Sequence, residues 1–321
     1  MKAKHGLVRG RFHPPHAGHH LLVRTAARAC ERVTVQVVAA PGERIPLERR
    51  AAWLREVHTP EPNVEVTCLA EVAAVDALFS EDTIGPGLLP VSSAQVRSDP
   101  IAFWEYLAPP VRADLAKRVV IIGAESTGKT TLARELRDRL AARGGAFAET
   151  RWVSELGRDY TLEKLALARA EAGSGALRPG MDDLTWTTGD FVAIARGQNA
   201  LEASEARAGG PVLVCDTDTF ATAVWHERYL DRRAAEVESL AIARPSLYLV
   251  THPDDVPFAA DEIRDGEHLR AWMTERFVER LRASPHRFEL LRGSRAERVA
   301  HACAAVDRWL TGAFAGDFGL G

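Results

Sequence analysis

The sequence predicts an α/β protein made of two doubly wound domains, each built on a parallel sheet. Apolar, β-branched runs alternate with amphipathic helical patterns along the chain, as parallel α/β folds require. Two glycine-containing loops, at residues 10–19 and 123–131, each follow a strand pattern and precede a helix pattern. With 321 residues, 46% of them hydrophobic, the chain is long enough to form two cores.

The first domain is assigned residues 1–105, where the pattern predicts a βαβαβ unit like the mononucleotide-binding half of a doubly wound sheet. The expected strands lie at residues 5–12, 33–39 and 64–69, and the expected helices at 18–30 and 47–57. After Leu69 the pattern weakens, and a loop rich in glycine and proline is expected at 84–90. The first domain is therefore expected to be short.

A connector at residues 106–117, broken at Pro109 and Pro110, leads to a second domain at 118–314. The strands expected in this domain are 118–123, 211–215, 246–251 and 287–291. The expected helices are 129–142, 183–206, 234–243, 267–283 and 296–310. A flexible loop is expected at 173–180, and residues 315–321 are expected to form a frayed tail.

Composition narrows the class of protein. Lys and Arg number 41 against 44 Asp and Glu, a net charge of −3, so no strongly basic nucleic-acid surface is expected. No apolar run approaches the length of a membrane span, and the N-terminus lacks the apolar core of a secretory signal. The four cysteines are scattered, which is typical of reduced thiols in a cytoplasmic protein without structural zinc. The oligomeric state is not predictable from these features.

The loop from Gly123 to Thr131 matches the phosphate-binding pattern GxxxxGK[ST]. Backbone N–H groups of such a loop surround a phosphate, and the following helix points its positive end at the same anion. Lys129 is expected to reach the β- and γ-phosphates of ATP, and Thr130 to ligate Mg²⁺. The ATP-binding residues predicted here are Gly123, Glu125, Ser126, Thr127, Gly128, Lys129, Thr130 and Thr131. The alternative is an ordinary glycine turn between a strand and a helix.

An acidic partner for the magnesium or the phosphate acceptor is expected at the end of a neighbouring buried strand. The segment PVLVCDTDTF supplies Asp216 and Asp218 after four apolar residues and a cysteine. Asp218 alone is also compatible with a helix N-cap. Downstream, Arg264 is the first candidate for neutralising charge on the transferring phosphoryl group, and the alternative is a solvated arginine at a helix end.

The loop from Gly10 to His19 contains an HxGH pattern formed by His16, Gly18 and His19. Two histidines beside a glycine at a helix N-terminus can donate hydrogen bonds to an anion, which positions an α-phosphate for nucleotidyl transfer. The ATP-binding residues predicted here are Gly10, Arg11, Phe12 and Gly18, with His16 and His19 as catalytic residues. The alternatives are a histidine-rich turn and a metal site with no third ligand in view.

A second part of this site is predicted at residues 91–97. Ser92 and Ser93 open a short helix pattern and can hold a phosphate, while Arg97 can bind the departing pyrophosphate. Two serines before a helix are also a common cap, so this motif is weak by itself.

Together these motifs resemble the NadR-type bifunctional enzymes, which join a Rossmann-like nicotinamide-nucleotide adenylyltransferase domain to a P-loop ribosylnicotinamide kinase domain. The resemblance covers most of the chain in the family's order, through GRFHPPHAGHH, SSAQVRSDPIAFWEY, GAESTGKTTLA, VSELGRDY, FVAIARGQ, CDTDTFATAVW and HPDDVPFAADEIRD. It implies phosphorylation of nicotinamide riboside by ATP and Mg²⁺, then adenylyl transfer from ATP to the mononucleotide NMN, giving NAD.

The resemblance also assigns roles to residues of the second domain. Glu155, Arg158 and Gln198 are implied to bind the riboside, and Asp216 or Asp218 to lie near its accepting hydroxyl, with Asp216 and Thr130 holding the magnesium. The implied partners are small molecules, with no nucleic acid and no membrane.

Three departures from the family alter these expectations. No helix-turn-helix precedes Gly10 in this sequence, so no repressor role is expected. The stretch from His19 to Ser92 is short, so a strand and helix that would help hold the pyridine nucleotide are expected to be missing. Glu262 stands where the family usually has glycine, which is expected to alter lid closure. The alternative function is a kinase of another nucleoside with a non-catalytic, nucleotide-sensing first domain.

Overall fold

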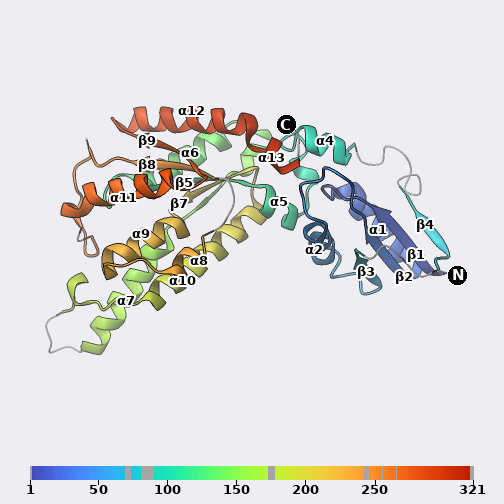
Figure 1. Ribbon diagram of the computed structural model, residues 1–321, viewed down its shortest axis with the longest axis horizontal. Coiled ribbons are helices and arrows are strands. Elements are labelled where there is room, and N and C mark those ends of the chain that lie inside the picture. The colour runs from blue at the N-terminus through green and yellow to red at the C-terminus, as the bar shows by residue number, and fades with distance from the viewer. Residues whose placement is uncertain are drawn as a thin grey trace. The chain divides into compact units, whose positions relative to one another are not determined.

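The computed structural model describes residues 2–68, 74–80, 90–172, 178–241, 246–254, 256–264 and 266–318. The chain divides into two compact units. Unit 1 comprises Met1–Ala116 and Leu310–Gly321, and unit 2 comprises Lys117–Trp309. Each unit contains its own parallel sheet (Figure 1), which confirms the fold class expected from the sequence.

The sheet of unit 1 has the strand order β3-β2-β1-β4, and every neighbouring pair is parallel. Its strands are β1 (Ala3–Gly10), β2 (Cys30–Val37), β3 (Val64–Thr67) and β4 (Ala77–Phe79). Its helices are α1 (Ala17–Ala29), α2 (Leu47–Val57), α4 (Ser93–Ser98), α5 (Pro109–Leu115) and α13 (Ala315–Phe318), with a 3₁₀ turn at Trp104–Tyr106. Side chains from β1, β2, α1 and α2 form the core, among them Val8, Val35, Val23 and Leu54.

Strand β4 is an element that the sequence pattern did not predict. It is three residues long and pairs with β1 through Gly6, Leu7 and Val8. Its central residue, Leu78, is 67% exposed, so the segment lacks the apolar run of a buried strand. The predicted loop at 84–90, except for Pro90, and the place of the missing strand and helix lie outside the described residues.

The sheet of unit 2 has the order β6-β7-β5-β8-β9, again with parallel neighbours throughout. Its strands are β5 (Lys117–Gly123), β6 (Arg151–Val153), β7 (Val212–Asp216), β8 (Ser246–Thr251) and β9 (Arg287–Leu291). All residues of β5, β7 and β8 are buried, as expected for a parallel sheet covered on both faces. Because β5 is central, the loop that follows it meets the carboxyl ends of β7 and β8, where ligands bind in such sheets.

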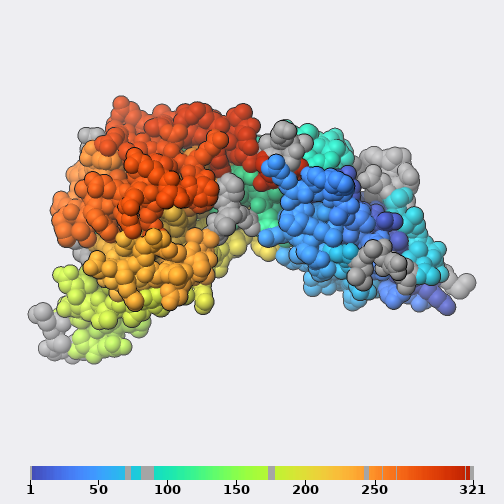
Figure 2. All heavy atoms as spheres, in the orientation of Figure 1, coloured from blue at the N-terminus to red at the C-terminus, as the bar shows by residue number. Residues whose placement is uncertain are grey.

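The helices of unit 2 surround this sheet, and α7 extends beyond the rest of the unit (Figure 2, yellow-green). They are α6 (Lys129–Ala141), α7 (Leu156–Ala172), α8 (Thr188–Ala208), α9 (Thr219–Leu230), α10 (Ala235–Glu238), α11 (Arg270–Arg282) and α12 (Arg295–Ala313). The last residues of α12, from Leu310, are assigned to unit 1. Short 3₁₀ turns lie at Gly145–Glu149, Met181–Asp183 and Glu267–Leu269.

Some helices of unit 2 differ from the expected pattern. Helix α8 begins at Thr188 rather than near residue 183, because Thr187 and Asp190 form a capping box at its N-terminus. Helices α7 and α9 were not predicted; α7 buries only Leu165, so it shows little apolar periodicity. Residues 173–177 of the predicted loop lie outside the described part of the chain.

The boundaries of the units also differ from the expected ones. Residues 106–116 belong to unit 1, where Asp114 accepts a hydrogen bond from Trp53 Nε1 at 2.6 Å. Residues 315–318 form α13 instead of a frayed end, because Phe318 is buried and its ring lies 6.3 Å from that of His13. In the described residues, no helix is both long and apolar enough to cross a membrane.

A buried ion pair ties the central strand of unit 2 to α8. Arg118 on β5 lies 3.1 Å from Glu202 on α8, and the two side chains are 5% and 2% exposed. Removing one member of such a pair leaves a buried charge without its partner, whereas an apolar pair of similar size removes both charges.

We predict that Arg118→Met lowers the free energy of unfolding by about 3–5 kcal/mol. Adding Glu202→Leu should restore most of that loss. Urea denaturation of the wild type, the single variant and the double variant measures both effects. A single variant as stable as the wild type would contradict this prediction.

Candidate functional site

The phosphate-binding loop lies between β5 and α6, and two of its glycines are required by geometry. A Cβ on Gly123 would lie 2.8 Å from the backbone oxygen of Thr251 on β8, so no side chain fits there. Gly128 has φ +85°, in the left-handed region that glycine adopts without strain. Thr127 Oγ1 lies 2.7 Å from Thr251 Oγ1, which fixes the loop against β8 from behind.

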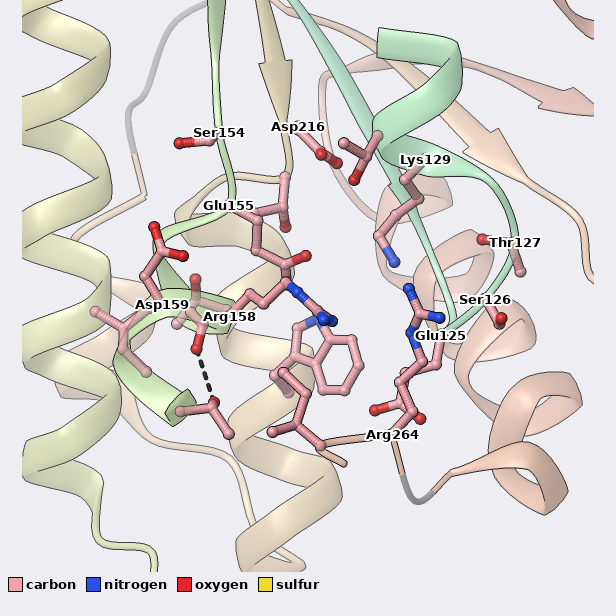
Figure 3. A pocket seen from close by; sticks show the side chains of 18 of the residues that line it. Glu125, Ser126, Thr127, Lys129, Ser154, Glu155, Arg158, Asp159, Asp216 and Arg264 are labelled. Carbon is pink, nitrogen blue, oxygen red and sulfur yellow. Dashed lines mark hydrogen bonds between the residues drawn. The ribbon is translucent and has the colours of Figure 1, made fainter. Parts of the chain in front are cut away.

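Lys129 and Asp216 lie close together at the carboxyl end of the sheet (Figure 3), and Thr130 lines the same cavity. Lys129 begins α6 and donates from Nζ to the backbone oxygen of Ala124 at 2.9 Å. Asp216 is the last residue of β7, is 1% exposed and accepts a hydrogen bond from the Thr130 hydroxyl. Burial raises the pKa of Asp216, while the charge of Lys129 opposes that shift. The structure therefore brings these three predicted residues together.

These side chains line a cavity of about 510 Å³. Of the predicted residues, Glu125 to Thr131, Glu155, Arg158, Asp216 and Arg264 line it. A cavity of this size accommodates a small ligand such as a nucleoside.

The residues after β6 form the side of the cavity that faces Lys129. Glu155 points toward Lys129 and Asp216 (Figure 3), and burial raises the pKa of its carboxyl. The charge of Lys129 lowers that pKa and the charge of Asp216 raises it. Arg158, one turn along α7, lies 2.8 Å from Asp261. The family-derived riboside residues Glu155 and Arg158 are thus at the cavity.

The segment at residues 256–264 lies over the phosphate-binding loop and is called the lid here. The backbone N–H of Ala259 donates to the Ser126 hydroxyl at 2.7 Å. Arg264 lines the cavity and donates from Nη1 to the Ala259 oxygen at 2.8 Å. Glu262 on the lid lies 2.9 Å from Arg169 on α7, a contact that glycine could not make.

Asp218 and Gln198 are not among the residues that line this cavity. Asp218 is the N-cap of α9, accepting from the Ala221 N–H at 3.0 Å, and it also accepts from the Tyr248 hydroxyl at 2.5 Å. Gln198 is 1% exposed, and its side-chain oxygen accepts from the Leu156 N–H at the start of α7 at 3.0 Å. Asp218 therefore acts as a helix N-cap, which was the alternative considered for it in the sequence. Gln198 holds the start of α7 in place.

Sequence reasoning missed an aromatic wall of the cavity, formed by Trp186, Phe191, Trp225 and Tyr229. The ring centroids of Trp186 and Tyr229 lie 5.1 Å apart, and Trp225 stacks on Tyr229 at 6.4 Å. Trp225 and Tyr229 are four residues apart on α9, so they share one face of that helix. That spacing was visible in the sequence but is equally typical of a helix packed in a core.

The donor set around Asp216 fits Mg²⁺. Its Oδ1 is buried and has no hydrogen-bond partner among the described residues. Carboxylate and hydroxyl oxygens are ligands that Mg²⁺ prefers, together with phosphate oxygens and water. Asp216 and Thr130 are therefore the residues that would hold the ion.

In unit 1, His16 and His19 lie together at the start of α1. Their ring centroids are 3.8 Å apart, and the His16 N–H donates to His19 Nδ1 at 3.3 Å. His16 is 2% exposed, and its ring nitrogens have no hydrogen-bond partner among the described residues. Burial lowers the pKa of His16 to about 4. Burial also lowers the pKa of His19, well below its ordinary value of 6.5. Both rings are therefore neutral near pH 7.

Helix α4 is tied to this loop by two predicted residues. Arg97 Nη1 donates to the His13 oxygen at 2.7 Å, and the Ser93 hydroxyl donates to the Pro14 oxygen at 3.1 Å. Ser92 is the N-cap of α4 and accepts from the Gln95 N–H at 3.3 Å. The structure thus brings Ser93 and Arg97 to the histidine loop. Ser92 caps α4, which was the alternative role considered for the two serines.

The remaining predicted residues of the loop have structural contacts. Phe12 is 2% exposed, belongs to the core, and its ring would lie 3.1 Å from a Cβ on Gly10. A Cβ on Gly18 would lie 3.1 Å from the His16 ring. Arg11 is exposed and lies 2.5 Å from Glu43.

Sequence reasoning missed a buried arginine beneath this loop. Arg50, 1% exposed, donates to the backbone oxygen of Arg11 and lies 2.9 Å from Glu43. No local motif marks Arg50 or Glu43, because their roles depend on contacts between segments distant in the sequence.

Two family models match the chain, and their matches overlap at residues 118–144. The family described as "AAA domain" matches residues 118–298, more than half of the chain, and the chain belongs to that family. The family described as "Cytidylyltransferase-like" matches residues 7–144, which include all of the histidine loop and α4.

Individual proteins extend the similarity over both units. Two proteins described as "Trifunctional NAD biosynthesis/regulator protein NadR", from Salmonella typhimurium and Escherichia coli, are 22% identical to this chain. Each match covers 81% of this chain and 71% of the relative. Two crystal structures of NadR, one in complex with NAD and AMP-PNP and one with NR, each give a TM-score of 0.69 and cover 96% of both chains, at 20% and 21% identity. The resemblance to NadR proteins is thus confirmed.

The burial of Asp218 predicts a pH-dependent stability. Burial raises the pKa of Asp218 from 3.8 to about 6, so the folded chain binds the proton more tightly than the unfolded chain. As the pH rises from about 4 through about 6, the unfolded chain loses this proton more readily than the folded chain, so the free energy of unfolding falls. Asparagine keeps a capping oxygen without the charge.

We predict that Asp218→Asn becomes more stable relative to the wild type by about 2 kcal/mol as the pH rises from about 4 to about 7. Urea denaturation of both proteins across this range measures the difference. A difference that does not change with pH would contradict the assigned contacts of Asp218.

Proposed function

We propose that unit 2 transfers the γ-phosphoryl group of ATP to a hydroxyl of nicotinamide riboside. The observation that carries this proposal is one cavity that joins the phosphate-binding loop, with Lys129 and Asp216, to an aromatic wall. Phosphoryl transfer requires mainly positioning and charge stabilisation, which the loop backbone, Lys129 and Arg264 supply.

Glu155 is proposed to receive the proton of the accepting hydroxyl. Its carboxyl faces Lys129 and Asp216, and burial raises its pKa, which makes it a better proton acceptor once ionised. Asp216 and Thr130 would hold Mg²⁺, which neutralises charge on the β- and γ-phosphates when bound. Arg264 would then stabilise the phosphoryl oxygens as the bond between the γ-phosphorus and the leaving ADP breaks and the bond to the riboside oxygen forms.

The aromatic wall is proposed to hold the pyridine ring of the substrate. The ring of nicotinamide riboside is a flat cation, and such groups bind over the faces of Trp and Tyr. The carboxyl groups of Glu155 and Asp159 line the same cavity and favour a cationic ligand. The similar NadR structure described as a complex with NR supports this choice of substrate.

Unit 1 is proposed to transfer an adenylyl group from ATP to the resulting mononucleotide, which forms NAD and releases pyrophosphate. Neutral His16 and His19 at the start of α1 can donate hydrogen bonds to the α-phosphate, and Arg97 is placed to bind the pyrophosphate. The names of the relatives, which describe NAD biosynthesis, support this second step. We place both reactions in the cytoplasm, with small molecules as partners.

We predict that Lys129→Ala lowers ATP-dependent phosphorylation of nicotinamide riboside by about 100-fold or more, because the β- and γ-phosphates lose their cation. Product formation is measured by liquid chromatography, and circular dichroism checks folding. Lys4→Ala, which removes an exposed lysine, is the matched control and should keep full activity. Phosphorylation of a different nucleoside, with none of nicotinamide riboside, would show that the proposed substrate is wrong.

We predict that the full chain makes NAD from NMN, ATP and Mg²⁺, and that His16→Ala and Arg97→Ala each lower this rate by about 100-fold or more. A pyrophosphate-release assay measures the rate. Arg24→Ala, which removes an exposed arginine that pairs with Glu61 and is not among the predicted site residues, is the control. Binding of ATP or NAD by calorimetry, with no pyrophosphate released by the wild type, would instead support a sensing role for unit 1.

A further inference from the structure

A buried ion pair behind the aromatic wall joins the phosphate-binding loop to α9. Arg228 Nη1 lies 3.1 Å from Glu125 Oε1, and the two side chains are 3% and 10% exposed. Removing two charges from water costs several kcal/mol per ion, and their attraction repays this only in good geometry with further hydrogen bonds. The stability of the fold alone therefore gives little reason for this pair. Its position next to the cavity indicates a role in the site instead.

The other oxygen of Glu125 holds the chain just beyond the lid. The backbone N–H of Gly266 donates to Glu125 Oε2 at 2.9 Å in a buried contact. A Cβ on Gly266 would lie 2.4 Å from Arg228 Nη2 and 2.7 Å from Arg228 Cζ. The backbone at Gly266 therefore lies directly against the guanidinium group, and a side chain at this position would have to displace that group.

The same guanidinium group stacks on the aromatic wall. Arg228 Cζ lies 5.0 Å from the ring centroid of Trp225 and 4.8 Å from that of Tyr229. Both rings line the cavity, whereas Arg228 is not among its lining residues. A planar guanidinium group can stack on rings and pair with a carboxylate at once, which a lysine ammonium group does less well. Arg228 thus contacts two parts of the site from outside the cavity. These are the aromatic wall, through Trp225 and Tyr229, and the phosphate-binding loop, through Glu125.

Resting on the proposed kinase function, we propose that Arg228 is a positioning residue that couples the binding of ATP to the binding of the acceptor. Its ion pair fixes Glu125 and, through Glu125, the backbone of Gly266. Its stacking fixes Trp225 and Tyr229. Because the Arg228 guanidinium group holds both parts, ATP bound at the loop and lid favours an ordered aromatic wall and so raises the affinity for the acceptor. By linkage, a bound acceptor raises the affinity for ATP by the same factor.

Three variants test this coupling. Arg228→Met removes the charge and keeps an unbranched stem, and Arg228→Lys keeps the charge but loses the planar stack. Arg280→Met is the matched control, because Arg280 pairs with Glu238 at 2.6 Å and lies over Phe220, none of which line the cavity. Circular dichroism confirms folding of each variant, and Glu125→Gln replaces Arg228→Met if that variant does not fold.

The first measurement needs no acceptor. Acrylamide quenching of tryptophan fluorescence is compared with and without AMP-PNP, and Trp225→Phe identifies the contribution of Trp225. AMP-PNP should protect Trp225 in the wild type and in Arg280→Met, partly in Arg228→Lys, and not in Arg228→Met. Protection in Arg228→Met equal to that of the wild type, or no protection in the wild type, would overturn the coupling.

The second measurement is calorimetric titration of AMP-PNP with and without nicotinamide riboside. In the wild type the riboside should raise the affinity for AMP-PNP about fivefold or more, and in Arg228→Met by less than about twofold. An equal increase in both proteins would overturn the coupling. If the riboside does not bind the wild type but Trp225 protection still depends on Arg228, the proposed substrate is wrong and the coupling stands.

Discussion

The arrangement of unit 2 depends on the close contact between the phosphate-binding loop and the carboxyl end of β8. Gly123 has no room for a side chain beside the Thr251 backbone, and the hydroxyls of Thr127 and Thr251 are 2.7 Å apart. From the far side, Arg298 donates to the Thr127 oxygen at 3.2 Å. The loop is therefore shaped by the protein before any phosphate arrives, so little ordering cost remains for binding.

The sequence was sufficient to predict the features of unit 2 that depend on neighbouring residues. Lys129 and Thr130 follow from the loop pattern, and Asp216 from an acidic residue at the end of a buried strand. The aromatic wall and the pair formed by Glu125 and Arg228 were not predictable, because the partners lie far apart in the sequence. The role of Asp218 could not be predicted either, because an aspartate that follows a strand looks the same in the sequence whether it caps a helix or faces a ligand.

In unit 1 the same distinction holds. The loop containing His16 and His19 was predicted from its spacing. Arg97 was predicted from a short helix pattern after two serines, a motif that is weak by itself. The buried Arg50 beneath the loop was missed, because nothing in its own segment marks an arginine as buried. Strand β4 was missed because three residues, one of them exposed, give too short a pattern to recognise.

Helix α13 has a consequence for how the protein is made. Residues 310–318 pack with unit 1, where Phe318 is buried near His13, although the whole of unit 2 lies between them in the chain. During translation the ribosome therefore releases all segments of unit 2 before unit 1 receives its last one. Unit 2 can fold as one uninterrupted stretch, whereas unit 1 is completed only as synthesis ends.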